Sequence, residues 1–277
     1  MSTPLPMTRG RRLALLLGVP IALALIAWIG LTEVAYAGLG SYPVWLAVPV
    51  HGSTVSLSTS AADVQVTQAP GSTLRLTGKA RYSLVRSTVT WRTTPSGVIV
   101  SPRCHFFIGD CSFSFRAVLP AGKRAILSNG SGNLTLRGLT GPVSVGSGSG
   151  DVQANRLSGA VSLQSGSGNV TGSALSGPRV TLRASSGNIT IDSLASLDVV
   201  VSDGSGNIAL TFSKVPTRVR VSDSSGNISV VLPRGPTHYQ VNGSTNSGNR
   251  IVSVPITTGS AHVITVSDGS GNVSVTN

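Results

Sequence analysis

The chain has 277 residues, of which 11% are charged and 4% are aromatic, together with 33 glycines. An ordinary globular domain carries roughly 25% charged residues, so this composition is typical of a β-rich, turn-rich protein. The 40% of apolar residues recur at regular intervals, a pattern that disordered chains lack. The net charge of +12 favours polyanionic partners, while a single glutamate, Glu33, leaves few carboxylates for catalysis.

An uncharged apolar stretch occupies residues 13–31 and follows Arg9, Arg11 and Arg12. At about 1.5 Å per residue, this stretch nearly spans a bilayer core of about 30 Å. Because basic flanks stay in the cytoplasm, we expect a cytoplasmic basic tail over 1–12, a transmembrane signal-anchor over 13–31 and a C-terminal ectodomain outside. The alternative is a secreted protein cleaved after Ala37, because residues 35–37 form an A-x-A site.

The segment after the apolar stretch divides into two parts. We expect residues 32–50 to be a linker. Residues 51–127 contain period-two apolar pairs, such as Val55 with Leu57 and Val64 with Val66, but no regular repeat. Period-two alternation predicts strands with one buried face, so we expect an irregular, membrane-proximal β region that closes one end of the domain that follows.

The only two cysteines, Cys104 and Cys111, lie in this irregular region. After export, thiols enter a compartment where disulfides form and persist, and we expect one bridge between them. Apolar alternation on both flanks, with Ile99 before and Phe113 after, predicts a hairpin whose arms bring the sulfurs together. The alternative is a pair of free, buried cysteines.

A basic stretch lies just before the second cysteine. It contains no acid between Asp63 and Asp110 and precedes a loop with two phenylalanines. An exposed apolar loop beside cations suits an anionic membrane surface or wall polymer. In the alternative interpretation, the loop folds back over the end of the domain and the cations solubilise strand edges. The candidate surface-binding residues are Arg75, Lys79, Arg81, Arg86, Arg92, Phe106 and Phe107, with Arg103 also in the stretch.

From residue 128 a short phrase recurs, S-G-N or S-G-D followed by an apolar-x-apolar triplet. Each copy carries two period-two segments separated by turn residues, which is too short for a βαβ crossover. The sequence therefore predicts an all-β fold, a right-handed parallel β-solenoid over 128–277 with 18–23-residue coils stacked on their neighbours, preceded by one N-terminal transmembrane helix. The phrase glycines are Gly132, Gly150, Gly168, Gly187, Gly206, Gly226, Gly248 and Gly271.

The recurring phrase has a structural explanation. Glycine adopts φ > 0 without penalty, and Asn or Asp bonds local backbone, so together they turn the chain between strands. Stacked coils would align the residues after the glycines into a side-chain ladder. This turn ladder comprises Gly132, Asn133, Gly150, Asp151, Gly168, Asn169, Gly187, Asn188, Gly206, Asn207, Gly226 and Asn227. The sequence indicates no cap for the C-terminal end of the solenoid.

Three runs, Val118–Gly122, Ser131–Leu136 and Gly148–Val152, resemble the bacterial putative-adhesin family. The resemblance covers roughly residues 50–277. It implies an exported bacterial β-repeat ectodomain behind one membrane span. It supplies no catalytic residue.

No catalytic constellation is evident in the sequence. The aspartates of the repeats are scattered, the histidines lack zinc-ligand spacing and no nucleic-acid-binding motif is present. A weak calcium site at Asp203 or Asp223 is an alternative, although only Asp151 is acidic among the phrase positions. We predict a non-enzymatic, adhesin-like structural or interaction module of the cell surface, with no metal, cofactor or nucleic acid. The alternative is an electrostatic binder of anionic cell-wall polymer or membrane surface.

Overall fold

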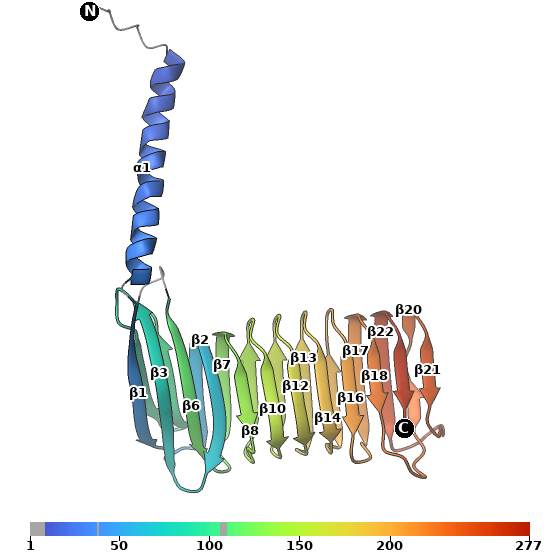
Figure 1. Cartoon of the computed structure of the whole chain (residues 1–277). Helices are drawn as coiled ribbons and strands as arrows, with labels where there is room; N and C mark the ends of the chain where they lie inside the picture. The colour runs from blue at the N-terminus through green and yellow to red at the C-terminus, as the bar shows by residue number, and fades with distance from the viewer. Residues whose placement is uncertain (1–8, 38, 106–109) are drawn as a thin grey trace, which may run out of the picture.

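The computed structural model describes residues 9–37, 39–105 and 110–277. One helix, α1 (Arg9–Ala37), precedes a two-layered β body that extends away from it (Figure 1). The helix starts before the predicted span, so Arg9, Arg11 and Arg12 belong to its first turn. Its segment Leu16–Glu33 has a mean hydropathy of 1.9 and none of its side chains is buried. By length and composition this helix fits a membrane anchor or a signal sequence.

Twelve short strands form the regular part of the solenoid. They alternate between two parallel sheets, so that each coil contributes one strand to each sheet. In the first sheet lie β8 (Leu134–Arg137), β10 (Val152–Leu157), β12 (Val170–Leu175), β14 (Ile189–Leu194), β16 (Ile208–Phe212) and β18 (Ile228–Val231). In the second lie β7 (Arg124–Ser131), β9 (Val143–Ser147), β11 (Val161–Ser165), β13 (Arg179–Ala184), β15 (Asp198–Ser202) and β17 (Arg218–Ser225).

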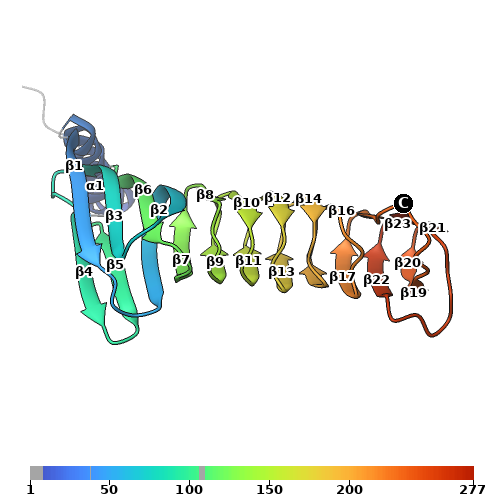
Figure 2. The same cartoon turned by 90° about the horizontal axis from the view of Figure 1, so that it is seen from below.

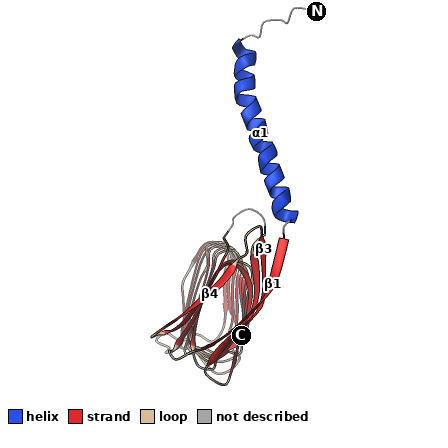
Figure 3. Ribbon diagram, turned by 90° about the vertical axis from the view of Figure 1, so that its left-hand side faces the viewer, coloured by secondary structure: helices blue, strands red, loops and turns tan. Residues whose placement is uncertain are grey.

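The core lies between the two sheets, which face each other along the whole body (Figures 2 and 3). Identical positions of successive coils pair in register, as in Val161 with Val180 and Val180 with Val199. Because side chains alternate along a strand, the Val, Leu and Ile residues at alternate positions of these strands, such as Val161, Leu163 and Val180, point inward and are buried. The parallel solenoid is therefore confirmed, and its hydrophobic core is a stack of aliphatic columns.

The corner glycines are required by close packing rather than by their dihedral angles. Gly132 has φ of +95°, but Gly168 and Gly187 do not have positive φ. A Cβ on Gly187 would instead lie 2.2 Å from the carbonyl oxygen of Gly168 in the preceding coil. The sequence-based explanation, in which these glycines are needed for φ > 0, is therefore wrong for most of them. Glycine is needed because stacking brings the carbonyl oxygen of one corner against the α-carbon of the next corner.

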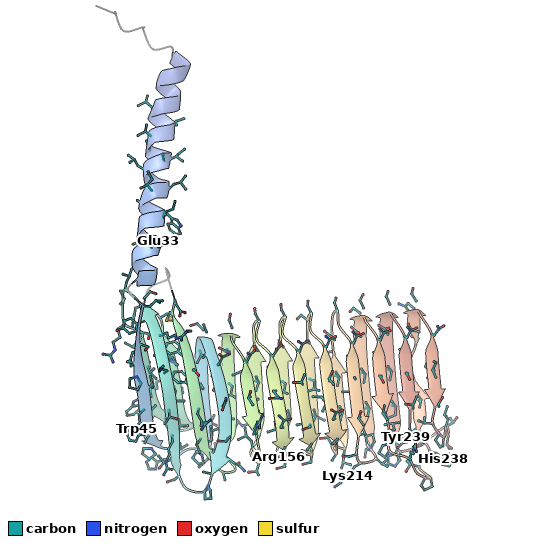
Figure 4. All side chains as sticks on the ribbon, viewed as in Figure 1. Glu33, Trp45, Arg156, Lys214, His238 and Tyr239 are labelled. Atoms are coloured by element: carbon teal, nitrogen blue, oxygen red, sulfur yellow. A yellow bond between two sulfur atoms is a disulfide. The ribbon has the colours of Figure 1, made fainter. Side chains whose placement is uncertain are left out.

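The opposite corner contains a column of left-handed residues. Gly138 has φ of +66°, and the stacked positions Arg156, Ala174 and Ser193 have φ of 54–57°. A non-glycine residue costs roughly 1 kcal/mol or more in this region. Arg156 and Lys214 mark this corner, which faces away from α1 (Figure 4). The parallel stack holds the same bend in coil after coil, whichever residue occupies it.

The N-terminal end is closed by antiparallel strands. Strand β2 turns from one sheet into the other and forms the first coil, pairing with β7 and β8 in parallel. Strands β6 and β5 continue the two sheets beside β2, followed by β3 and β1 in one sheet and β4 in the other. Their bounds are β1 (Leu39–Pro49), β2 (Thr54–Ala69), β3 (Thr73–Ser83), β4 (Thr88–Thr94), β5 (Gly97–Arg103) and β6 (Ser112–Pro120).

One segment predicted from the sequence, the linker, is wrong. Residues 32–50 are not a linker, because α1 continues to Ala37 and β1 begins at Leu39. The alternation of Tyr42, Val44, Leu46 and Val48 packs this strand against the core. Residues 51–127 form strands, as their alternation predicted, and they include the first coil and most of the antiparallel cap.

The coils at the C-terminal end do not stack in chain order. Strands β22 (Val263–Ser270) and β23 (Val273–Thr276) pair directly with β17 and β18. The outermost coil is the earlier segment, with β19 (Gln240–Asn242), β20 (Thr245–Ser247) and β21 (Arg250–Ser253). The later coil is therefore inserted between two coils that precede it in sequence, and the earlier coil is the cap that the sequence did not indicate.

Replacing Gly187 with alanine tests the corner packing. The added Cβ would collide with the Gly168 carbonyl, and we expect Gly187→Ala to lower the free energy of unfolding by about 2 kcal/mol. Gly146→Ala is the matched control, because a Cβ there meets nothing within 4 Å. Urea unfolding of the full chain, followed by circular dichroism, should leave this control within about 0.5 kcal/mol of wild type. Equal losses in the two variants would contradict the packing explanation.

Candidate interaction surface

The outward face of the N-terminal cap is cationic around an exposed tryptophan. On β3, Leu74, Leu76 and Ala80 point into the core, so Arg75, Lys79 and Arg81 point outward. Arg116 of β6 pairs with Thr77 and lies on the same face. Trp45 of β1 also pairs with Thr77, and 76% of its side chain is exposed. We call these residues the cap face: Trp45, Arg75, Lys79, Arg81 and Arg116.

A groove of about 260 Å³, lined by aromatic and aliphatic residues together with Arg86, opens at the end of the solenoid. It lies between β1 and β4, the last strands of the two sheets (Figure 3). Tyr42 from β1 and Trp91 from β4 line it, and 51% of Trp91 is exposed. The guanidinium of Arg86 lies 4.1 Å from the centre of the Tyr42 ring, within the range of a cation–π interaction.

The structure separates the basic residues that the sequence placed in one stretch. Arg75, Lys79 and Arg81 share the cap face, whereas Arg86 lies at the end groove. Arg92 is on β4 in the other sheet, where it pairs with Ile99. Phe106 and Phe107 lie outside the described residues. Arg116 joins the cap face because β6 pairs with β3, a pairing that no local sequence pattern indicated.

The disulfide between Cys104 and Cys111 is present, with the two α-carbons 6.0 Å apart. It does not join the arms of a hairpin. Strand β5, before it, pairs in one sheet, and β6, after it, pairs in the other. The predicted hairpin is therefore wrong, and the bridge clamps the crossover between the two layers of the cap. The sequence could not distinguish the two arrangements, because the strands beside the cysteines show the same apolar alternation in a hairpin as in opposite sheets.

The turn ladder lies at the corner that leads into β8, β10, β12, β14, β16 and β18, and this corner is on the side of α1 (Figure 1). Its Asn side chains, with Asp151 among them, are linked from coil to coil into a row by hydrogen bonds. The backbone N–H of Asn188 donates to Asn169 Oδ1 at 3.0 Å, and that of Asn207 donates to Asn188 Oδ1 at 2.9 Å. At the last coils the row follows their order in space and not their order in sequence. The backbone N–H of Asn272 donates to Asn227 Oδ1, and that of Asn249 donates to Asn272 Oδ1. Each coil thus satisfies a backbone donor of the next coil.

A second column, which the sequence did not reveal, is buried inside the same corner. It holds polar residues at one inward position of every coil, next to the turn ladder. Its members are Thr59, Asn129, Ser147, Ser165, Ala184, Asp203, Asp223, Asp268 and Thr245 in stacking order. This position is polar in eight coils and Ala in one. Inward positions were predicted from apolar alternation, so the sequence did not indicate that this one is buried.

The buried column contains three aspartates, and the pKa of two of them is raised. Only 7% of Asp203 and Asp223 and 5% of Asp268 is exposed. Desolvation raises the pKa of Asp203 and Asp223, and the charges of Asp203 and Asp268 raise the pKa of Asp223 further. Within residues 9–37, 39–105 and 110–277, no group of three His, Cys, Asp or Glu side chains could hold a metal ion.

Comparison with known proteins gives a family and a fold. The model of the family described as Toastrack DUF4097 matches residues 119–276. The structure is similar to a "putative lipid binding protein" from Parabacteroides distasonis, with a TM-score of 0.55 and 15% identity over 85% of this chain and 97% of that one. A "putative adhesin" from the same organism gives 0.50 and 15% identity over 85% and 96%. No curated protein matches the chain.

Removing the disulfide should loosen the cap. A bridge across seven residues of sequence constrains the unfolded chain by about 2 kcal/mol. We expect Cys104→Ser/Cys111→Ser to lower the thermal unfolding midpoint of the full chain, and reductant to lower that of wild type equally. Intact mass with and without reductant should differ by about 2 Da in wild type only. A reductant effect on the double variant would show that the loss has another cause.

Proposed function

This chain belongs to the Toastrack DUF4097 family, and we propose that it is a non-enzymatic, membrane-anchored module of the cell surface that binds an anionic polymer of the envelope. In this proposal α1 is retained as a single-pass anchor with the solenoid outside. The cap face is the binding surface. The observation that carries the proposal is the alignment of four outward cations around the exposed Trp45.

The geometry of the cap face suits an extended polyanion. Strands β1 and β3 are each 11 residues long, so they present a long, pleated surface. Along β3, Arg75 and Lys79 are separated by roughly 14 Å and Lys79 and Arg81 by roughly 7 Å, at 3.4 Å per residue. A chain with repeated phosphate or carboxylate groups contacts several such cations at once, and its apolar segments pack on the tryptophan ring.

The charge distribution of the β body also supports this assignment. Residues 39–120 contain seven Lys or Arg and two Asp. The one ion pair among the described residues joins Arg179 and Asp198 in the distal coils. The cations of the cap face are therefore available to an external anion. The acids of the buried column, by contrast, are enclosed in the corner, where a polymer chain has no access.

Charge removal on the cap face tests this function. The triple variant Arg75→Ser/Lys79→Ser/Arg81→Ser should weaken binding of polyphosphate and of polygalacturonate about tenfold or more at low salt, because it removes three contacts. Wild-type binding should weaken steeply as salt increases. The full chain is held in nanodiscs of neutral lipid and binding is measured by biolayer interferometry, with dextran as the uncharged polymer.

The matched control removes three exposed distal cations, Arg183→Ser/Arg218→Ser/Arg220→Ser, and should keep wild-type affinity. Equal losses in the two triple variants would assign binding to net charge and contradict a site on the cap. Trp45→Ser should weaken polygalacturonate binding at high salt, where the apolar contact remains. Binding to vesicles with anionic lipid, but to neither polymer, would assign the cap face to a membrane surface instead.

A further inference from the structure

The buried column shows what the corner of each coil requires from its inward side chain. Asn129 Nδ2 donates to the carbonyl of Gly132 at 2.8 Å, and Ser147 Oγ donates to that of Gly150 at 3.0 Å. At the far end, Thr245 Oγ1 donates at 2.8 Å to the carbonyl of Gly271, which is the corner glycine of the neighbouring coil that contains Asp268. In three coils a side-chain hydrogen therefore satisfies the carbonyl of the corner glycine.

Three neighbouring coils have aspartate at this position. Asp203 Oδ1 accepts the backbone N–H of Gly204 at 2.7 Å, whereas its Oδ2 is buried without a partner. That Oδ2 lies against the corner glycine, since a Cβ on Gly206 would be 2.5 Å from it. In the next coil, Asp223 Oδ1 accepts the backbone N–H of Ser225 at 3.3 Å, and its Oδ2 is again buried without a partner and lies against Gly226. An ionised carboxylate has no hydrogen to donate, so it leaves this buried oxygen unpaired.

The third aspartate is the least satisfied. Neither side-chain oxygen of Asp268 has a hydrogen-bond partner, and both are buried. The three carboxyl groups lie on adjacent strands, which are about 4.8 Å apart. Ala184 precedes the group and Thr245 follows it, and the turns around it contain only Gly and Ser between each aspartate and its corner glycine. The charges acting on Asp223 are those of Asp203 and Asp268, both of the same sign.

We propose that Asp203, Asp223 and Asp268 form a proton-operated lock on the distal coils. The carboxyls of Asp203 and Asp223 bind protons as the surroundings become acidic, and their O–H groups then donate to the carbonyls of Gly206 and Gly226, as the amide of Asn129 does to that of Gly132. Asp268 contributes the negative charge next to Asp223. Protonation removes the like-charge repulsion and satisfies the buried oxygens together. The lock includes the inserted coil, because Asp268 lies in β22 between β17 and β20.

The direction of the pH dependence follows from proton linkage. Burial raises the pKa of Asp203 and Asp223 above the unfolded value, so the folded coils bind protons more tightly than the unfolded chain. Their stability is then greatest in acid and decreases as the pH rises through the folded pKa.

Hydrogen exchange resolves the lock coil by coil. The full chain in neutral nanodiscs is measured by mass spectrometry at pH 7.5 and 4.5, the lower value being close to the unfolded pKa of aspartate, with rates corrected for intrinsic exchange. We expect protection of peptides from residues 198–276 to rise about tenfold or more at the lower pH, while peptides from 124–184 serve as an internal control and stay constant. Asp203→Asn/Asp223→Asn/Asp268→Asn should be highly protected at both pH values, because an amide donates without a proton.

Two further variants distinguish the lock from other effects. Asp223→Ser gives this coil a serine at the column position, as Ser147 and Ser165 do in other coils. We expect it to raise the hydrogen-exchange protection of the distal peptides at pH 7.5 and to make that protection less dependent on pH. Asp192→Asn, an exposed change in β14, should behave as wild type. The proposal fails if wild-type distal protection is constant or falls in acid, if the triple Asn variant keeps the wild-type pH response, or if Asp192→Asn reduces that response equally.

Discussion

The approach of one coil to the next at the Ser-Gly-Asn corner sets the rest of this structure. Parallel strands require each coil to repeat the path of the coil before it at the strand spacing of about 4.8 Å. At the corner this spacing places a carbonyl oxygen against the next α-carbon, as Gly168 does against Gly187. Only a residue without a Cβ fits there. The glycine fixes the register, and the register in turn aligns the aliphatic columns of the core, the exposed asparagine row and the buried polar column.

Much of the regular solenoid could be predicted from sequence, because its signals are local and repeated. The phrase and its spacing indicated coils, and alternation such as Val161 with Leu163 indicated which side chains are buried. The order of the last coils could not be predicted in this way. The corner of Gly271 fits against Gly226 just as the corner of Gly226 fits against Gly206, and repeat sequences that are this similar do not specify which neighbour they take.

The candidate sites were less predictable than the fold, for a related reason. Arg75, Lys79 and Arg81 share a face by simple alternation along one strand. Arg116 and Trp45 join them only through the antiparallel pairing of β1, β3 and β6, which depends on contacts between distant segments. The buried column is non-local as well. Its aspartates appear ordinary in sequence, and their environment results from stacking that leaves them enclosed beside one another.

The insertion of β22 and β23 between earlier coils has a consequence for biogenesis. A ribosome makes residues 239–253 before residues 263–276, yet the earlier segment packs on the later one. While the later segment is missing, β17 and β18 present open parallel edges that the earlier coil is able to occupy temporarily. The outermost coil therefore reaches its native place only after residues 263–276 have been synthesised.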